Sequence, residues 1–367
     1  MDKAPDSVLL NAFQPMEARF DSGIPFGDLS QIRVFGITGA SGGVGKRLAQ
    51  RLRAAGKVVR AFVRPSSDTE ALRLWGVELV FGDIRDLVAL ARFSSNLDVC
   101  FHLAAQVSKA HPDVCREVNV EGTRAVCTAL RMHNPTCRLV YCSSIVAKDL
   151  SFMRRFTLSA YAKSKCDAES IVRRCLAQGD LQVTIIYPGY VYGPYDRHFL
   201  PAVASALRNG MPFVVRGGEQ NAPIVYVDDL CDLFCLAATS KIAVGKSYSS
   251  LKQNELGIHG FLRLLANHLG YHYPRRRLPR WPLVVVALTL GVVWRLLRNE
   301  KEPPLTLRVI NFLSSRGREF LDDAKRDLGW DHVVSFEEGI TQSSSYWTQL
   351  ASTTVPTDGQ TRSCFRR

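Results

Sequence analysis

The first half of the chain alternates between short apolar runs and longer stretches with apolar residues at helical spacing. The apolar runs have the length of buried strands, and the longer stretches have the 3.6-residue period of amphipathic helices. The predicted strands are 32–38, 57–63, 77–81, 98–103, 138–142 and 183–187. The predicted helices are 43–55, 68–75 and about 113–132. This alternation predicts an α/β fold with a doubly wound parallel sheet covered by helices on both faces.

From about residue 195 the alternation weakens, and turn sequences such as Asn209-Gly and Arg216-Gly-Gly interrupt the chain more often. We therefore predict a smaller mixed C-terminal lobe over 195–350, interleaved with the sheet and available for substrate. Residues 1–31 are predicted to form an N-terminal extension. Residues 351–367 are rich in Thr, Ser and Arg and are predicted to form a mobile tail.

One segment of this lobe, 281–297, is almost entirely apolar, and its uncharged part ends at Arg295. It is shorter than the roughly 20 apolar residues that span a bilayer as a helix. Trp281 and Trp294 lie near its ends, as interfacial anchors often do. Arginines flank it on both sides: Arg275, Arg276, Arg277, Arg280, Arg295 and Arg298. Two interpretations stay open and are compatible, a helix buried in the lobe or a peripheral membrane contact.

The composition limits which binding partners and which cellular compartment are expected. The 367 residues carry a net charge of +13, which can attract nucleic acid, an anionic membrane or a phosphorylated cofactor. No zinc-finger spacing or basic heptad region occurs, so no nucleic-acid partner is expected. The 10 Cys are scattered without a C-x-x-C pair, which favours free thiols over a disulfide frame or a metal site. No secretory signal is recognised at the N-terminus, so we expect a cytoplasmic protein, with membrane association through 281–297 left open.

A glycine-rich turn, Thr38–Gly45, follows the first predicted strand. Gly39, Gly42 and Gly45 have the spacing G-x-x-G-x-x-G, which suits a tight turn, close approach of a phosphate and helix packing. Backbone N–H groups at the start of the next helix would bind pyrophosphate oxygens. The turn, including Ser41, Gly43 and Val44, therefore predicts a Rossmann-type dinucleotide-binding domain over 32–194. The alternative is a plain glycine-rich loop.

The end of the second strand bears on the choice of cofactor. An acidic residue there would bind the ribose of NAD, but the strand ends at Arg64-Pro65. An arginine at this position suits a 2′-phosphate, and Lys46 and Arg47 add charge near the turn. We therefore expect NADP(H) as the preferred cofactor, with NAD(H) as the other option. The alternative is that Arg64 is a solvated surface residue.

Tyr161 and Lys165 lie four residues apart, which places them on one face of a helix. A phenol with a pKa near 10 is a poor base at neutral pH. A nearby ammonium and the positive nicotinamide of an oxidised cofactor would stabilise the phenolate and lower that pKa. With the glycine turn, the pair predicts hydride transfer coupled to proton transfer at a carbon bearing a hydroxyl or ketone.

These motifs, in this order, resemble the extended short-chain dehydrogenase/reductases. That group includes nucleotide-sugar epimerases, dihydroflavonol reductases and 3β-hydroxysteroid dehydrogenases. The resemblance runs from about residue 32 to 347, and the matching motifs are Thr38–Gly45, Gly82–Ile84, His102–Ala105, Asn119–Thr123, Tyr141–Ser144, Tyr161–Lys165, Tyr187–Pro194, Tyr226–Asp229, Gly329-Trp330 and Glu337–Gly339.

The resemblance implies a role for each matching residue. Ser144, Tyr161 and Lys165 would be catalytic, and Ser144 would orient the substrate oxygen. Asn119 would bind a water that links Lys165 to solvent. The residues implied to contact the cofactor, in addition to the glycine turn, Arg64, Tyr161 and Lys165, are Asp83, Ile84, Leu103, Ala104, Ala105 and Pro188. The family also implies a small-molecule substrate and a homodimer.

The chain departs from the family pattern at three places. Ser144 and Tyr161 are closer in sequence than in most extended members, which implies a more open pocket. Tyr187 stands where arginine is usual. No arginine occurs in 220–225, where nucleotide-sugar enzymes bind the substrate phosphate. Together with the apolar segment and Asn221, the last departure makes the chain more similar to the 3β-hydroxysteroid dehydrogenase branch.

The sequence therefore favours an NAD(P)-dependent oxidoreductase that interconverts an alcohol and a ketone on an apolar, sterol- or lipid-like substrate. Two alternatives stay open: a nucleotide-sugar epimerase or dehydratase, and a non-catalytic NAD(P)-binding scaffold.

Overall fold

The protein is built around a parallel sheet. The computed structural model describes residues 29–107, 111–148, 159–218, 222–251, 256–297, 303, 305–314 and 323–353. Within them, a seven-stranded sheet has the order β10-β6-β5-β4-β1-β2-β3, and each neighbouring pair is parallel. The strands are β1 Val34–Thr38, β2 Val58–Val63, β3 Glu78–Phe81, β4 Val99–His102, β5 Arg138–Cys142, β6 Gln182–Tyr187 and β10 Ser247–Ser249. The predicted doubly wound fold of the Rossmann type is confirmed.

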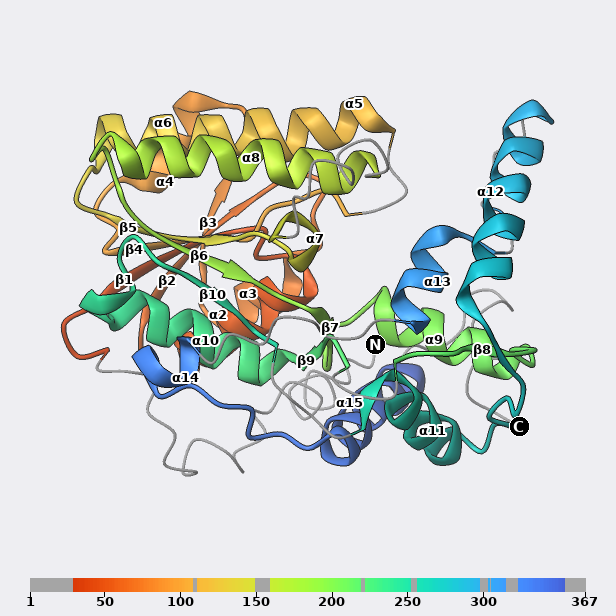
Figure 1. Ribbon diagram of the computed structural model, residues 1–367. Helices are drawn as coiled ribbons and strands as arrows, with labels where there is room; N and C mark the ends of the chain where they lie inside the picture. The colour runs from red at the N-terminus through yellow and green to blue at the C-terminus, as the bar shows by residue number, and fades with distance from the viewer. Residues whose placement is uncertain are drawn as a thin grey trace, which may run out of the picture.

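Helices cover both faces of this sheet (Figure 1). One face carries α4 (Leu87–Ser94), α6 (Gly122–His133) and α8 (Ala160–Ala177), and the other carries α2 (Gly43–Ala54) and α10 (Val227–Thr239). Side chains of a strand point alternately to the two faces. In β5, Leu139 and Tyr141 accordingly belong to one buried cluster and Val140 to the other. Because both faces of each strand are buried, the strand sequences are continuous apolar runs rather than alternating apolar and polar residues.

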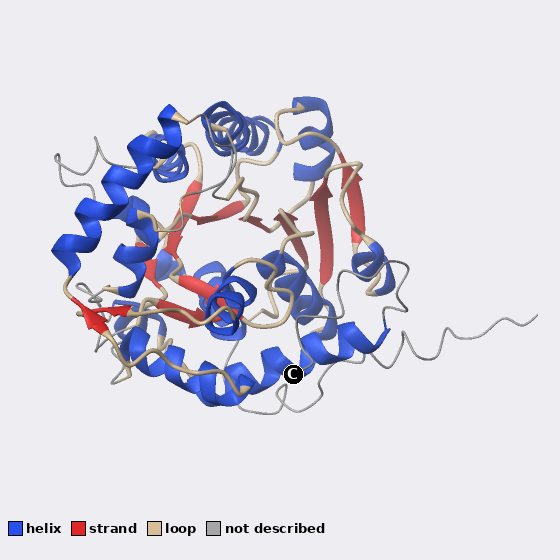
Figure 2. Cartoon of the chain, turned by 90° about the vertical axis from the view of Figure 1, so that its right-hand side faces the viewer, coloured by secondary structure: helices blue, strands red, loops and turns tan. Residues whose placement is uncertain are grey.

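The C-terminal half returns to the sheet and also builds a second group of helices. Strand β10 pairs with the edge strand β6, so the two halves of the chain share one sheet. Two small sheets join β7 (Tyr190–Tyr192) to β9 (Ile224–Tyr226), and β8 (Val214–Val215) to β11 (Arg277–Leu278). The other helices are α3 Glu70–Leu74, α5 Pro112–Cys115, α7 Ile145–Lys148, α9 Phe199–Arg208, η4 Lys241–Ala243, α11 Gly257–Leu269, α12 Arg280–Leu296, α13 Leu307–Leu313, α14 Asp323–Leu328 and α15 Phe336–Thr353. Figure 2 shows helices around the main sheet, with strands of a small sheet at the edge of the view.

Most predicted bounds lie within two residues of the observed ones. The predicted helix 113–132 differs, because it consists of α5, a π-helical turn η2 (Arg116–Glu121) and α6. The apolar segment 281–297 forms α12. Residues 351–353, assigned in sequence to the tail, continue α15. Residues 1–28 and 354–367 lie outside the described residues, so the extension and the tail stay predictions.

Candidate active site

The glycine turn lies at the carboxyl end of β1, where α2 begins. Gly39 has φ +74°, and an added Cβ would lie 2.7 Å from the backbone nitrogen of Ala104. A Cβ on Gly45 would collide with the backbone of Gly39 and Ala40. Both positions therefore require glycine, the first for the turn and the second for the packing of α2 against it.

The start of α2 suits a phosphate group. Gly42 is the N-cap, no side chain caps the helix, and its first turn contains no acidic residue. Backbone N–H groups at such a terminus favour an anion. A pyrophosphate fits this donor set, so the turn residues Thr38–Gly45 are the ones that would hold a nicotinamide dinucleotide.

Loop residues after β4 are tied to the same turn. The backbone N–H of Ala104 donates to the Thr38 hydroxyl at 3.2 Å, and that of Leu103 donates to the Thr38 carbonyl at 3.2 Å. The carboxyl ends of β1 and β4 are thus held side by side, which is where ligands bind in open parallel sheets. The structure brings Leu103 and Ala104 to the turn, while their predicted contact with a cofactor stays a prediction.

Two basic residues near the turn form ion pairs with carboxylates of the protein. Lys46 pairs with Asp68 at 2.7 Å. Arg47 makes a two-point contact with Asp228, at 2.6 and 2.8 Å. Their expected contribution of charge near the phosphates is therefore offset by these carboxylates. Arg64 lies exposed just beyond the carboxyl end of β2, and its predicted contact with a 2′-phosphate stays a prediction.

Asp83, implied to contact adenine, binds a neighbour instead. Arg85 donates to the Asp83 carboxylate at 2.7 and 3.2 Å, and this ion pair lowers the pKa of Asp83. Arg85 also pairs with Glu117 at 2.8 Å. The adenine contact of Asp83 and Ile84 stays a prediction.

Helix α8 carries Tyr161 and Lys165 toward the end of β5. Ser159 caps the helix, because its hydroxyl accepts from the backbone N–H of Ala162 at 3.2 Å. The Ser144 hydroxyl lies near enough to Tyr161 to lower the pKa of its phenol, and Lys165 donates to the Cys142 carbonyl at 2.6 Å. The structure therefore gathers the three predicted catalytic residues around the carboxyl end of β5.

The two adjacent serines have different partners. Ser144 contacts Tyr161, whereas the Ser143 hydroxyl donates to Glu169 at 2.6 Å. Only the second serine of the motif is thus directed at the candidate catalytic tyrosine. Residues 149–158, which connect Ser144 to α8, lie outside the described residues, so the expected openness of the pocket stays a prediction.

The expected lowering of the Tyr161 pKa requires a bound oxidised cofactor and stays a prediction, and in the protein alone the shift has the opposite direction. Burial is the largest cause of a shift that raises the pKa of Tyr161 to about 12, and the hydrogen bond from Ser144 opposes it. Burial also lowers the pKa of Lys165. The ammonium of Lys165 is directed at the Cys142 carbonyl, and dry surroundings disfavour a phenolate. Tyr161 is therefore a protonated phenol at neutral pH.

Asn119 lies in the π-helical turn and connects three segments. Its side-chain oxygen accepts from the backbone N–H of Gln106 at 2.7 Å, and its amide donates to the Gln106 carbonyl and to the Ser164 hydroxyl. Ser164 in turn donates to the Tyr161 carbonyl at 2.8 Å. Both amide hydrogens are thus used by protein groups. The geometry supports a positioning role for Asn119, while its predicted contact with a water stays a prediction.

His102 is the centre of a buried polar chain that sequence reasoning did not assign. Its two ring nitrogens lie 2.6 Å from the Thr38 hydroxyl and 2.9 Å from the Thr123 hydroxyl, which donates to the Asn119 carbonyl. Burial lowers the pKa of His102 to about 3, so the ring is neutral. The chain links the glycine turn to Asn119. Its signal in the sequence was a histidine at the end of an otherwise apolar strand.

Glu169 joins Tyr187, which stands where the family usually has arginine, to Arg173. The Tyr187 hydroxyl donates to Glu169 at 2.6 Å, and Arg173 donates to the same carboxylate at 2.8 Å and to Tyr187 at 2.7 Å. Arg173 thus supplies the positive charge beside Tyr187. Glu169 lies one helical turn after Lys165, and that spacing on the inward face of α8 could have identified it.

An aromatic group lies near the candidate catalytic tyrosine. Tyr190 is one of the groups whose charge raises the pKa of Tyr161. Its ring lies 4.7 Å from that of Phe312 and 5.3 Å from that of Phe199, between ring centres. These residues come from β7, α13 and α9, so the C-terminal half provides aromatic carbon surface on this side of the candidate site. Pro188, just before Tyr190, accepts from the backbone N–H of Ile145 and thereby holds α7 in place.

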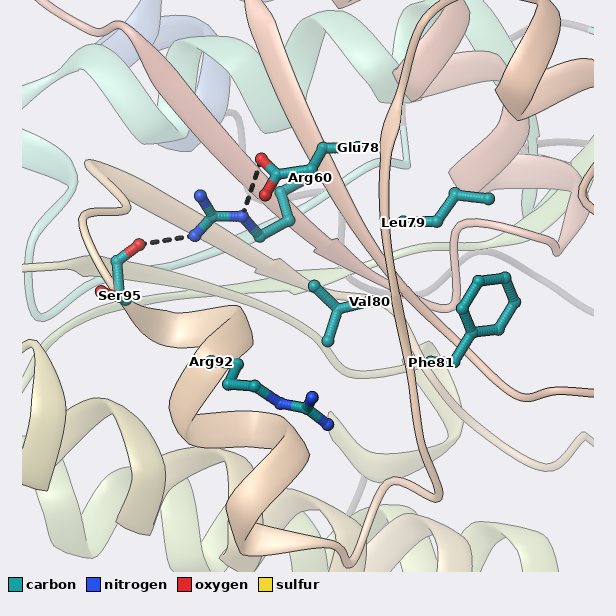
Figure 3. Close-up of a pocket in the computed structure, with 7 residues that line it drawn as sticks. All are labelled: Arg60, Glu78, Leu79, Val80, Phe81, Arg92 and Ser95. Atoms are coloured by element: carbon teal, nitrogen blue, oxygen red, sulfur yellow. Dashed lines mark hydrogen bonds and ion pairs between the residues drawn. The ribbon is translucent and has the colours of Figure 1, made fainter.

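A separate hollow of about 650 Å³ lies at the far edge of the sheet, along β3 and the end of α4 (Figure 3). Arg60 crosses it, with an ion pair to Glu78 at 2.9 Å and a hydrogen bond to the Ser95 carbonyl. None of the candidate catalytic residues lines it. This hollow is therefore not part of the candidate active site.

Comparisons with known proteins agree with this fold. The model of the NAD dependent epimerase/dehydratase family matches residues 36–249. A 2-alkyl-3-oxoalkanoate reductase from Shewanella oneidensis is 28% identical over 334 residues, which cover 83% of this chain and 84% of the relative. A 3beta-hydroxysteroid-dehydrogenase/decarboxylase from Arabidopsis thaliana is 24% identical and covers 87% and 81%. The solved structure of gox2253 superimposes with a TM-score of 0.72 at 26% identity, covering 86% of this chain and 98% of the other.

Proposed function

The chain belongs to the NAD dependent epimerase/dehydratase family, and we propose that this oxidoreductase of the extended short-chain dehydrogenase/reductase type reduces the ketone of an apolar, lipid-like substrate to an alcohol. The observation that carries the proposal is the grouping of Tyr161, Ser144 and Lys165 at the carboxyl end of β5, with aromatic carbon surface on the same side of the site. A phenol that is protonated at neutral pH has no free base to take a proton, but it can donate its own proton to a developing alkoxide, which is a stronger base than phenolate.

A reduced nicotinamide cofactor supplies the hydride when it is bound. Ser144 holds the carbonyl oxygen against the phenol. As the carbonyl carbon gains the hydride, the electron pair of the double bond moves to oxygen, which takes the proton of Tyr161. The phenolate that forms is stabilised by the ammonium of Lys165, which lies one helical turn along α8, and regains a proton from solvent.

The apolar nature of the substrate rests on two features. The aromatic group around Tyr190 offers ring faces rather than charges, and residues 220–225 contain no arginine for a diphosphate. The relatives named as acting on 2-alkyl-3-oxoalkanoates and 3β-hydroxysteroids support the same substrate class. The test is consumption of NADPH with a panel of oxoalkanoates and steroid ketones, with the alcohol product identified by mass spectrometry. Strong stabilisation by a UDP-sugar, without ketone reduction, would favour the epimerase alternative.

Tyr161→Phe tests the proton donor. Loss of a positioned general acid is expected to lower kcat by roughly 10²- to 10⁴-fold. Binding of NADPH, measured by its fluorescence, should be unchanged, because the phenol hydroxyl is not needed for the glycine turn to hold pyrophosphate. A variant with full activity would remove Tyr161 from the mechanism.

We also propose that NADP(H) is preferred over NAD(H), through Arg64. Arg64→Leu is expected to reduce the NADPH preference in kcat/KM by roughly 10- to 100-fold, the value of a lost charge-assisted hydrogen bond. Arg33→Leu is the matched control, since Arg33 is equally exposed but precedes β1 at the opposite end of the strands. Equal effects of the two substitutions would show that only net charge is involved.

A further inference from the structure

Helix α12 exposes a continuous apolar stripe. Trp281, Val285, Leu288, Val292 and Leu296 are 72, 56, 53, 57 and 77% exposed. They recur at intervals of three or four residues, which places them along one side of the helix. In Figure 1 the helix extends away from the body of the molecule. Val286, Val293 and Leu297 are also exposed and widen the stripe.

The other side of α12 attaches the helix to the protein. Leu283 and Ala287 are buried, and α12 contacts α13. No charged residue occurs from Trp281 to Trp294. Surface helices normally turn polar residues to water, and exposed apolar patches of this kind mark sites of interaction. The helix is therefore anchored through one side and offers carbon surface to a partner on the other.

The charges beside the stripe identify that partner. Arg275, Arg276 and Arg280 are exposed at its N-terminal end, and none of them forms an ion pair with the described part of the chain. No Asp or Glu occurs from Leu256 to Asn299. A basic rim around apolar carbon is complementary to an anionic lipid surface. A second copy is a poorer occupant, because a twofold contact would bring this basic region against itself.

We propose that α12 docks the protein onto an anionic membrane surface, with its apolar stripe among the lipid chains and the arginines against the headgroups. Among the described helices, none is long and apolar enough to cross a bilayer. The 17 residues of α12 would extend about 25 Å, so the helix would lie along the interface. Trp281 at one end suits the headgroup level. This inference does not depend on the proposed reaction.

Docking in this orientation would place the membrane next to the candidate active site. α12 contacts α13, Phe312 of α13 contacts Tyr190, and the charge of Tyr190 acts on the pKa of Tyr161. These steps lead from α12 toward the candidate active site. A substrate dissolved in the bilayer would meet the site from this side.

The test is sedimentation of the full chain with phosphatidylcholine vesicles, with and without phosphatidylserine. We expect binding to the phosphatidylserine vesicles, and an affinity lower by at least about 10-fold for phosphatidylcholine alone or at high salt. Combined Val285→Ser, Leu288→Ser and Val292→Ser should lower the affinity for the anionic vesicles by at least about 10-fold. Arg275→Gln with Arg276→Gln should remove the preference for phosphatidylserine.

The matched control replaces three apolar residues elsewhere, Leu74→Ser, Val88→Ser and Met132→Ser, which are 57, 73 and 66% exposed. This control should bind as the unchanged protein does. The proposal is overturned if the unchanged protein ignores both vesicle types or if the α12 variant binds equally well. It is also overturned if sedimentation velocity without lipid shows a dimer that the α12 substitutions dissociate, because a second copy would then cover the helix. Thermal melting of each variant checks that it is folded.

Discussion

The candidate active site and helix α12 depart in opposite directions from the usual placement of side chains. At the site, polar groups are buried: Asn119, Lys165 and His102 are at most 3% exposed, and each has hydrogen-bond partners. At α12, apolar groups are exposed, and Leu296 reaches 77%. Either arrangement is costly for a folded protein in water. Each therefore indicates a region shaped by what it binds.

The two regions differ in what offsets this cost in free energy. The buried polar groups are offset within the protein, because they bind one another through the hydrogen bonds from Thr38 to Asn119. Nothing in the described part of the protein covers the stripe on α12, so its compensation must come from outside. We infer that substitutions will affect folding and chemistry strongly in the first region and weakly in the second.

Lys165→Met should give the largest effect, because it removes a charge that is fully enclosed. We expect kcat to fall by roughly 10³-fold, since the phenolate formed on Tyr161 would lose its nearby ammonium. Steady-state kinetics with a reducible ketone measures the loss. Lys163→Met, on the exposed side of the same helix, is the control and should retain activity. If both variants were active, Lys165 would take no part in the reaction, and its burial would serve only the packing of the protein.

Much of the sheet and the site was predictable because its signals are local. Apolar runs located the strands, and the glycine spacing and the four-residue interval of Tyr161 and Lys165 placed the turn and the catalytic pair. What escaped prediction depends on distant partners. The pairing of Arg47 with Asp228 joins residues 181 positions apart. The raised pKa of Tyr161 likewise depends on burial by several elements, which no local pattern reports.

Thr123→Val tests how much the buried hydrogen bonds from Thr38 to Asn119 contribute to stability. The substitution preserves shape but removes the hydroxyl that serves His102 and the Asn119 carbonyl. Two buried polar groups lose a partner, so the free energy of unfolding should fall by about 2–4 kcal/mol. Urea denaturation measures the change. Thr128→Val on the same helix, at a half-buried position, should cost much less. If both substitutions lowered the free energy of unfolding equally, the hydrogen bonds from Thr38 to Asn119 would contribute no stability beyond that of ordinary packing.

Asp229 sharpens the comparison, because this buried carboxylate is only partly paired. One oxygen accepts from the backbone N–H of Val333 at 3.2 Å, and the other has no hydrogen-bond partner among the described residues. Burial raises the pKa of Asp229 to about 7. The folded state thus keeps a proton that the unfolded state has lost, and this contribution to stability is present at low pH and disappears as the pH rises to about 7.

Asp229→Asn should remove that pH dependence. The gain in free energy of unfolding over the unchanged protein should be larger at pH 8 than at pH 5, by about 2 kcal/mol. Urea denaturation at the two pH values measures it. A difference that stays constant with pH would show that Asp229 is ionised throughout and paired better than its contacts indicate, with His332, 4.0 Å away, as the nearest basic group to examine.

Val292→Gln should give the smallest change in the free energy of unfolding. A large change would directly contradict the comparison between the two regions. Val292 is 57% exposed on the stripe, so replacing it should change the free energy of unfolding by less than about 0.5 kcal/mol. Leu283→Gln, one turn from the start of the same helix but buried, should cost about 2–3 kcal/mol, because it places an amide in the contact between α12 and the lobe. Both values come from urea denaturation without lipid. If Val292→Gln were as costly as Leu283→Gln, the stripe would be covered in solution, and α12 would be an ordinary buried helix of an assembly.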